Sequence, residues 1–177
     1  PQRLSLQSRY GVSNSKLLET IENMQRHFEH PLPIPELARR VHDTSDSKVV
    51  PQIIHFMKVA RSGWRQTIET LEIADIERII HDFGLAALRA REAGYDGVEI
   101  MGSEGYFLNQ FLVTHTNKRE DRWGGSYENR MRLPVEVVKR VRAAVGAEFI
   151  VIYRLSMIDL IPNGSSWEEV VLLAKEI

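Results

Sequence analysis

The chain has 177 residues, of which 43% are hydrophobic and 27% charged, and its formal net charge is -1. These values fit one folded domain or parts of two, and they exclude both a disordered tail and a polyelectrolyte that binds nucleic acid or membranes through bulk charge. The absence of Cys excludes disulfides, thiolate metal sites, iron–sulfur ligands and Cys nucleophiles. The sequence has neither a run of about 18 apolar residues nor an apolar leader, which predicts a cytoplasmic protein without a membrane span.

The first third of the chain predicts two helices and one short strand. Apolar residues recur at helical spacing from Ser15, a suitable N-cap, to Phe28, and prolines then end the helix. A second short helix follows from Ile34 to Val41, and the polar residues 42–48 form a linker. Residues 49–54 are β-branched enough for a strand, which Pro51 restricts to an edge of a sheet or a strand start.

The remaining sequence alternates between helices and strands. Helices are predicted over 76–93 and 131–145, each closed by a following glycine, and a last helix opens with a capping box of Ser166 and Glu169. Strands are predicted over 95–100 and 149–153, and the second is apolar enough to be covered on both faces. A long polar connection runs from Met101 to about Gly125. The order indicates an α/β fold with parallel strands, too few to close a barrel.

Polar side chains follow both strands where parallel α/β folds place their chemistry. Glu104 and Tyr106 follow the first strand, and Arg154 ends the second. A phenol beside a carboxylate can donate a proton to a developing carbanion, and a guanidinium can hold a phosphate or a negatively charged ring. The alternative is structural, with Tyr106 packed on the rim and Arg154 paired with a nearby acid. No metal site is predicted.

The connection between the strands carries a charged motif. Residues 117–132 read N-K-R-E-D-R-W-G-G-S-Y-E-N-R-M-R, with alternating charge around a Gly-Gly turn. Such a pattern can build an ion-paired frame that holds a loop rigid, whereas the alternative is a solvated run of charge. A loop of this length inside a compact domain is usually functional.

This motif resembles the old yellow enzyme family of flavin oxidoreductases, whose loop reads N-x-R-x-D-x-aromatic-G-G-S-x-E-N-R-x-R. The resemblance covers residues 72–177, and within this range residues 93–100 and 153–156 also match the family. Residues 102–106, G-S-E-G-Y, resemble the bacterial 2,4-dienoyl-CoA reductase branch. The resemblance implies part of an FMN-containing (β/α)8 TIM barrel that reduces a conjugated C=C bond of an unsaturated carbonyl or acyl-CoA substrate with electrons from NADPH or NADH.

The resemblance also implies roles for single residues. Tyr106 matches the family's proton donor, and Arg154 matches a side chain that contacts FMN. Glu104 matches a substrate-facing position that tunes Tyr106, and His115 matches a basic substrate contact. Gln52 resembles the flavin-binding Gln of the third barrel strand, although an edge-strand Gln without a flavin fits this short match equally well. Without Cys, the iron–sulfur cluster of the branch has no ligands in this chain.

The start of the chain resembles a different family. Residues 1–42 are similar to the opening of an AraC-type DNA-binding domain, which gives three expected parts: a helical regulator-like fragment at 1–44, a linker with a residual barrel strand at 45–71, and the partial oxidoreductase barrel at 72–177. The alternative function is therefore a DNA-binding fragment with an inert α/β appendage. Because the linker replaces the helix that would read the major groove, we expect no sequence-specific DNA binding. The unpaired strand edges predict self-association.

Overall fold

The computed structural model describes residues 34–55 and 67–177. The expected helix from Ser15 to Phe28 lies outside these residues. The described elements are, in order, α3 (Ile34–Thr44), β1 (Gln52–Ile53), the 3-10 helix η1 (Ile68–Thr70), α4 (Ile73–Glu92), β2 (Gly97–Gly102), α5 (Phe107–Leu112), α6 (Tyr127–Val145), β3 (Ile150–Leu155) and α7 (Trp167–Glu176).

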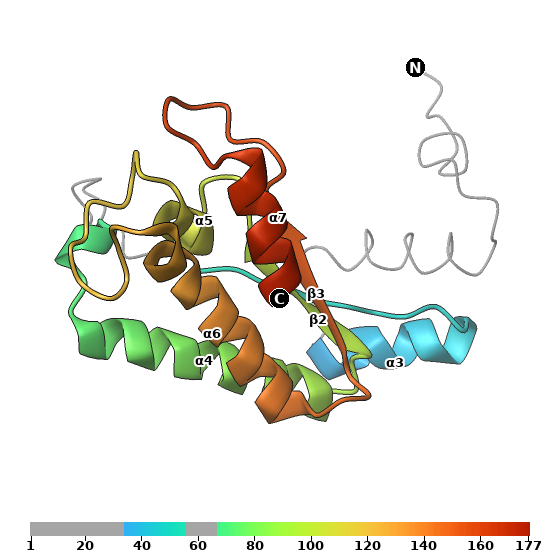
Figure 1. Cartoon of the computed structure of the whole chain (residues 1–177). Helices are drawn as coiled ribbons and strands as arrows, with labels where there is room; N and C mark the ends of the chain where they lie inside the picture. The colour runs from blue at the N-terminus through green and yellow to red at the C-terminus, as the bar shows by residue number, and fades with distance from the viewer. Residues whose placement is uncertain (1–33, 56–66) are drawn as a thin grey trace, which may run out of the picture.

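The three strands form one parallel sheet in the order β1-β2-β3. Glu99 lies opposite Gln52 on one side and Ile152 on the other, and Met101 lies opposite Arg154. Helices α4 and α6 run side by side along one face of the sheet (Figure 1). The α/β alternation with parallel strands is therefore confirmed, as is the position of β1 at an edge. No helix in residues 34–55 or 67–177 has the length and apolar character needed to cross a bilayer.

The core lies between the sheet and the two long helices. Alternate residues of β2, Val98 and Ile100, are fully buried on the helix side. They pack with the apolar stripes of α4 and α6 and with the aromatic side of α5. Burying a side chain of this size contributes about 1.5–3 kcal/mol, so this cluster is the main source of stability.

The prediction that the strand over 149–153 is covered on both faces is wrong. The burial of β3 alternates, and Ile150 and Ile152 on the side away from the helices are 38% and 41% exposed. Among the described residues no second layer covers that side of the sheet. Val151 and Tyr153 of this run face the helices, whereas Ile150 and Ile152 face the open side.

The long polar connection after β2 contains a short helix that the sequence analysis did not predict. This helix is α5, whose Phe107, Leu108, Phe111 and Leu112 are all buried. Their spacing places them on one face of a helix, a signal that the surrounding polar residues obscured. Helix α6 also begins earlier than expected, at Tyr127, because the side chain of Ser126 accepts the backbone N–H of Asn129 as an N-cap.

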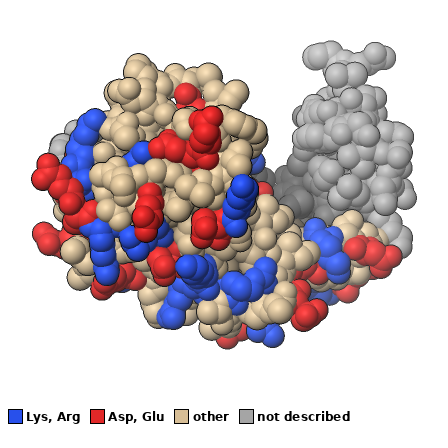
Figure 2. All heavy atoms as spheres, in the orientation of Figure 1, with Lys and Arg blue, Asp and Glu red and all other residues tan. Residues whose placement is uncertain are grey.

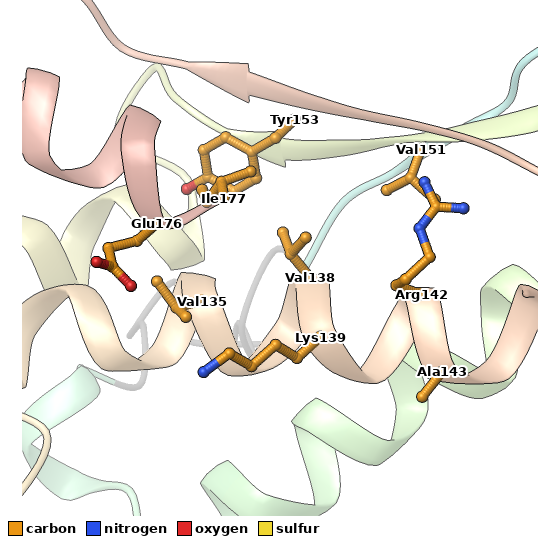
Figure 3. Close-up of a pocket in the computed structure, with 9 residues that line it drawn as sticks. All are labelled: Val135, Val138, Lys139, Arg142, Ala143, Val151, Tyr153, Glu176 and Ile177. Atoms are coloured by element: carbon orange, nitrogen blue, oxygen red, sulfur yellow. The ribbon is translucent and has the colours of Figure 1, made fainter. Parts of the chain in front are cut away.

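A hollow lies on the helix side of β3, beside the edge of the described sheet. It has a volume of about 400 Å³, and its walls come from α6, from Val151 and Tyr153 of β3, and from the end of α7 at Ile177 (Figure 3). The ring of Tyr153 lies so close to Gly102 that a Cβ there would be 2.1 Å from the ring. Any side chain at position 102 would clash with this ring, which packs on the helix side of the sheet, so the pairing of β2 with β3 requires glycine there.

At the opposite end of the strands, Asp96 joins α3 to the sheet. Its carboxylate accepts the backbone N–H of Val49 at 2.8 Å, Nε2 of His42 at 2.8 Å, and Nζ of Lys48 at 3.2 Å. Burial raises the pKa of Asp96, but the bonds from Val49, His42 and Lys48 outweigh it and lower the pKa to about 2. The ionised carboxylate therefore stabilises the docking of α3.

This pKa predicts acid sensitivity with a defined window. A carboxyl whose pKa is depressed by folding contributes stability above its unfolded value of 3.8, and that contribution is lost as the pH falls through about 2. We expect the free energy of unfolding of wild type to fall by about 2 kcal/mol more than that of Asp96→Asn between pH 5 and pH 2. Urea unfolding across this range measures it. The exposed Asp82→Asn is the control and should retain the wild-type slope.

Candidate active site

An ion pair joins the loop after β2 to the end of β3. Glu104 Oε1 accepts Nε and Nη2 of Arg154 at 3.0 and 2.8 Å. The hydrogen bonds that Arg154 donates to Glu104 raise the pKa of Arg154, and its guanidinium stays charged. Glu104 adopts a left-handed φ of 61°, which bends the chain directly after the strand and turns the carboxylate toward β3. Two of the predicted site residues are thus in direct contact.

Gln52 is connected to this pair through a residue that the sequence analysis did not single out. Its amide Nε2 donates a hydrogen bond to Oε1 of Glu99, the residue opposite it in the sheet. The same oxygen of Glu99 lies 3.7 Å from Nη1 of Arg154. The two residues predicted to contact a flavin therefore share one carboxylate on the open face of the sheet. An acid inside an otherwise apolar strand was the signal available in the sequence.

Tyr106 is the N-cap residue of α5, two positions after Glu104. Its backbone N–H donates to Ser103 at 3.1 Å and its carbonyl accepts from Gln110 at 3.0 Å. The next residue, Phe107, is fully buried. The half-buried phenol is therefore carried on backbone that is fixed on both sides, which is the preorganisation that a proton donor needs.

His55, just beyond β1, is a second residue that the sequence analysis did not assign to the site. Its ring packs against Phe107 with 4.4 Å between the ring centroids. Burial lowers the pKa of His55, with a smaller opposing effect from Asp82, and so favours the neutral imidazole. This places a neutral ring beside the residue that follows Tyr106.

His115 lies apart from these residues in sequence and is exposed, in the turn after α5. The neighbouring Thr114 donates its hydroxyl to the carbonyl of Asn163 at 3.2 Å. That bond connects the turn to the loop that follows β3. His115 is therefore on a segment that contacts the loop after Arg154, with its side chain open to solvent.

The charged motif at 117–132 builds the predicted frame. Arg119 Nη1 donates to the carbonyls of Ile68 and Leu71 at 2.6 and 2.8 Å, while its Nε donates to Asp121 at 3.1 Å. The bond from Arg119, opposed in part by burial, lowers the pKa of Asp121. Asn117 spans the loop by donating to the carbonyls of Phe111 and Trp123 at 2.7 and 2.8 Å. The alternative of a solvated charge run is wrong for this motif.

Arg130 extends the frame to the last helix. Its buried guanidinium donates to the carbonyls of Leu112 and Gly125 and forms a 2.5 Å ion pair with Glu169 of α7. Glu169 also accepts the backbone N–H of Ser166, which completes the predicted capping box. The motif thus holds α5, α6 and α7 together behind the candidate site.

Charge elsewhere does not indicate a second kind of site. On the face in Figure 2, acidic and basic side chains are interspersed. Within the described ranges no group of three or more His, Asp or Glu residues could hold a metal ion. The hollow in Figure 3 faces the helices, whereas Arg154 and Glu99 are on the other side of the sheet.

The fold and these residues are those of a parallel α/β protein whose candidate site lies toward the carboxyl ends of its strands, where such folds carry their chemistry. The donor set suits a flavin, because an exposed guanidinium and an amide complement the carbonyl oxygens and N–H of a flavin's pyrimidine edge.

Residues 34–177 match the model of the NADH:flavin oxidoreductase / NADH oxidase family. The chain belongs to this family. It is 33% identical over 181 aligned positions to a multifunctional alkene reductase/demethylase OYE of Caballeronia cordobensis, covering 90% of this chain and 26% of that protein.

Two solved structures are also similar. The old yellow enzyme homologue from Zymomonas mobilis superposes with a TM-score of 0.71 at 29% identity, over 81% of this chain and 48% of that one. A 2-naphthoyl-CoA reductase superposes with a TM-score of 0.60 at 34% identity, over 72% of this chain and 19% of that one. The partial TIM-barrel fold is therefore confirmed.

This chain spans less than half the length of each of these three relatives. The family match begins at residue 34, so it includes α3 and β1 as well as the expected barrel segment from residue 72. Of the segment compared with AraC-type regulators, residues 1–33 lie outside the described residues, and α3 is joined to the sheet through His42 and Asp96.

Proposed function

We propose that this chain supplies the proton donor and part of the flavin-binding surface of an FMN-dependent reductase. Its substrate is a C=C bond conjugated to a carbonyl, and the electrons come from NADH or NADPH. The observation that carries the proposal is the linked set of Gln52, Glu99, Arg154 and Glu104, with Tyr106 two residues beyond Glu104.

In this proposal Arg154 and Gln52 hold FMN, which when bound supplies hydride transfer to the alkene carbon far from the carbonyl. Tyr106 donates the proton on its phenolic oxygen to the alkene carbon next to the carbonyl, and solvent returns a proton to that oxygen. One hydride and one proton together saturate the double bond. Glu104 keeps Arg154 oriented and tunes Tyr106 through its negative charge.

We further propose that the substrate is an acyl thioester of the 2,4-dienoyl-CoA kind. Support comes from the segment 102–106, which resembles that branch, and from the similarity to a structure described as a 2-naphthoyl-CoA reductase. His115, exposed on the turn beside the loop after β3, is the proposed basic contact for an anionic part of this substrate.

We also propose that the chain self-associates. β3 is the last strand of the described sheet, and its open face carries the exposed Ile150 and Ile152. An edge strand next to exposed apolar side chains favours pairing with another copy.

Size-exclusion chromatography with full-spectrum detection tests the proposed reductase function and the proposed self-association. We expect a protein peak with the absorbance of bound flavin after addition of FMN, bleached by NADH or NADPH and recovered on addition of a conjugated enone or enoyl-CoA. We expect its elution volume to shift with concentration. A colourless peak in the presence of excess FMN would overturn the proposed function, and a concentration-independent monomer would overturn self-association.

A further inference from the structure

We propose that Glu99 is a positioning residue that holds Gln52 and Arg154 in a single arrangement and determines which atom of Gln52 faces a ligand. The proposal concerns two contacts of one carboxylate oxygen, the hydrogen bond from Gln52 and the approach of Arg154 at 3.7 Å. As far as it concerns flavin binding, it rests on the proposed function.

The chemistry of Glu99 fixes the orientation of the Gln52 amide. An ionised carboxylate can only accept hydrogen bonds, so it must face the amide nitrogen rather than the amide oxygen. The opposite edge of the amide then presents its oxygen as an acceptor. Without Glu99, the two ends of the amide would be nearly equivalent, and Gln52, which is exposed, could turn either way.

Sheet geometry places Glu99 between its two partners. Gln52 lies directly opposite it in the register of β1 and β2, and Arg154 lies on β3 one step further along the same face, opposite Met101. Glu99 is less exposed than either partner, with 24% of its side chain accessible against 49% for Arg154. A carboxylate held in the middle of the sheet can therefore act as a fixed anchor for both.

The charge of the group distinguishes Glu99 from Glu104. One guanidinium faces two carboxylates, so the set carries one net negative charge. Glu104 is more than half exposed, at 53%, and stands on a loop, whereas Glu99 is in the middle of a strand. An anionic ligand at Arg154 can thus replace Glu104 while Glu99 keeps the guanidinium in place.

The first test uses the ligand-free protein and side-chain NMR. The Gln52 amide and Arg154 Nη–H signals are assigned by their loss in Gln52→Ala and Arg154→Lys. We expect Glu99→Gln to shift both signals and Glu99→Asp to retain part of the wild-type shifts. The exposed Glu120→Gln is the control and should move neither. If Glu99→Gln moves only one signal or none, the proposal is wrong, whether or not the protein binds flavin.

The second test is the affinity for FMN, measured by quenching of flavin fluorescence. Loss of a charge-assisted hydrogen bond predicts binding weaker by about tenfold in Glu99→Gln, with melting temperature close to that of wild type. Gln52→Ala in the Glu99→Gln background should add little, because without Glu99 the Gln52 amide is no longer held in the orientation that faces the ligand. Unchanged affinity in Glu99→Gln would overturn the positioning role, whereas absence of binding by wild type would overturn the proposed function and leave the NMR result to decide on Glu99.

Discussion

Tyr106→Phe is expected to reduce the NADH- or NADPH-dependent reduction of a conjugated enone by about 10²- to 10⁴-fold while leaving bound flavin unchanged. The substitution removes only the hydroxyl, so the ring at the start of α5 and the buried Phe107 behind it keep their positions. The proton donor is lost without loss of packing. Steady-state rates and the flavin absorbance of the same sample measure the two effects separately.

Tyr127→Phe is a matched control for this experiment. The Tyr127 hydroxyl is buried in α6 and has no hydrogen-bond partner among the described residues. Burial raises the pKa of this phenol to about 12, so it holds its proton more tightly than an ordinary phenol and is a poorer acid. Its removal should leave turnover within about twofold of wild type. If Tyr106→Phe lost its flavin, or if both variants lost activity equally, the role assigned to Tyr106 would be wrong.

The second large effect is expected on stability, in Arg130→Met. This change leaves the carbonyls of Leu112 and Gly125 and the carboxylate of Glu169 without their donor. Removing one partner of a fully buried ion pair costs about 3–5 kcal/mol; the Glu169 side chain is 23% accessible, so we expect a loss near the lower end of this range. Urea unfolding followed by circular dichroism measures the loss.

Two further variants make this result interpretable. Arg91 is exposed at the end of α4, so Arg91→Met makes the same substitution outside a buried contact. It should lower the free energy of unfolding by less than about 0.5 kcal/mol. Glu169→Gln removes the charge but retains an acceptor for Arg130, and should cost about 1–2 kcal/mol, which keeps the measurement possible if Arg130→Met does not fold. Equal stability of Arg130→Met and Arg91→Met would show that the frame around Arg130 does not stabilise the fold.

Local sequence signals predicted the long helices α4 and α6, the last helix and most strand positions correctly. The cap at Ser166 with Glu169, and the apolar faces of α4 and α6, depend on residues three or four positions apart, so the sequence contains the whole interaction. The charged motif at 117–132 predicted a rigid loop for the same reason, since many of its bonds are local. Helix α5 was missed because its six residues are short of two full turns and stand within polar sequence.

The sequence predicted only some of the residues of the candidate site. Tyr106 and Glu104 stood out because they follow a strand, and Arg154 because it lies near the end of one; the structure brings Glu104 and Arg154 into contact. Glu99 and His55 did not stand out. Their partners, Gln52 and Phe107, are about fifty residues away, and only the pairing of β1 with β2 and the packing of α5 bring them together.

The amino-acid sequence alone determined the order of helices and strands, the flavin oxidoreductase family and the residue types able to donate a proton or hold a cofactor. The tertiary structure decided which side chains meet: one carboxylate of β2 between an amide of β1 and a guanidinium of β3, and Arg130 of α6 with Glu169 of α7. The reason is that strand register and helix packing set distances between residues far apart in the chain, and no periodicity within a segment encodes those distances.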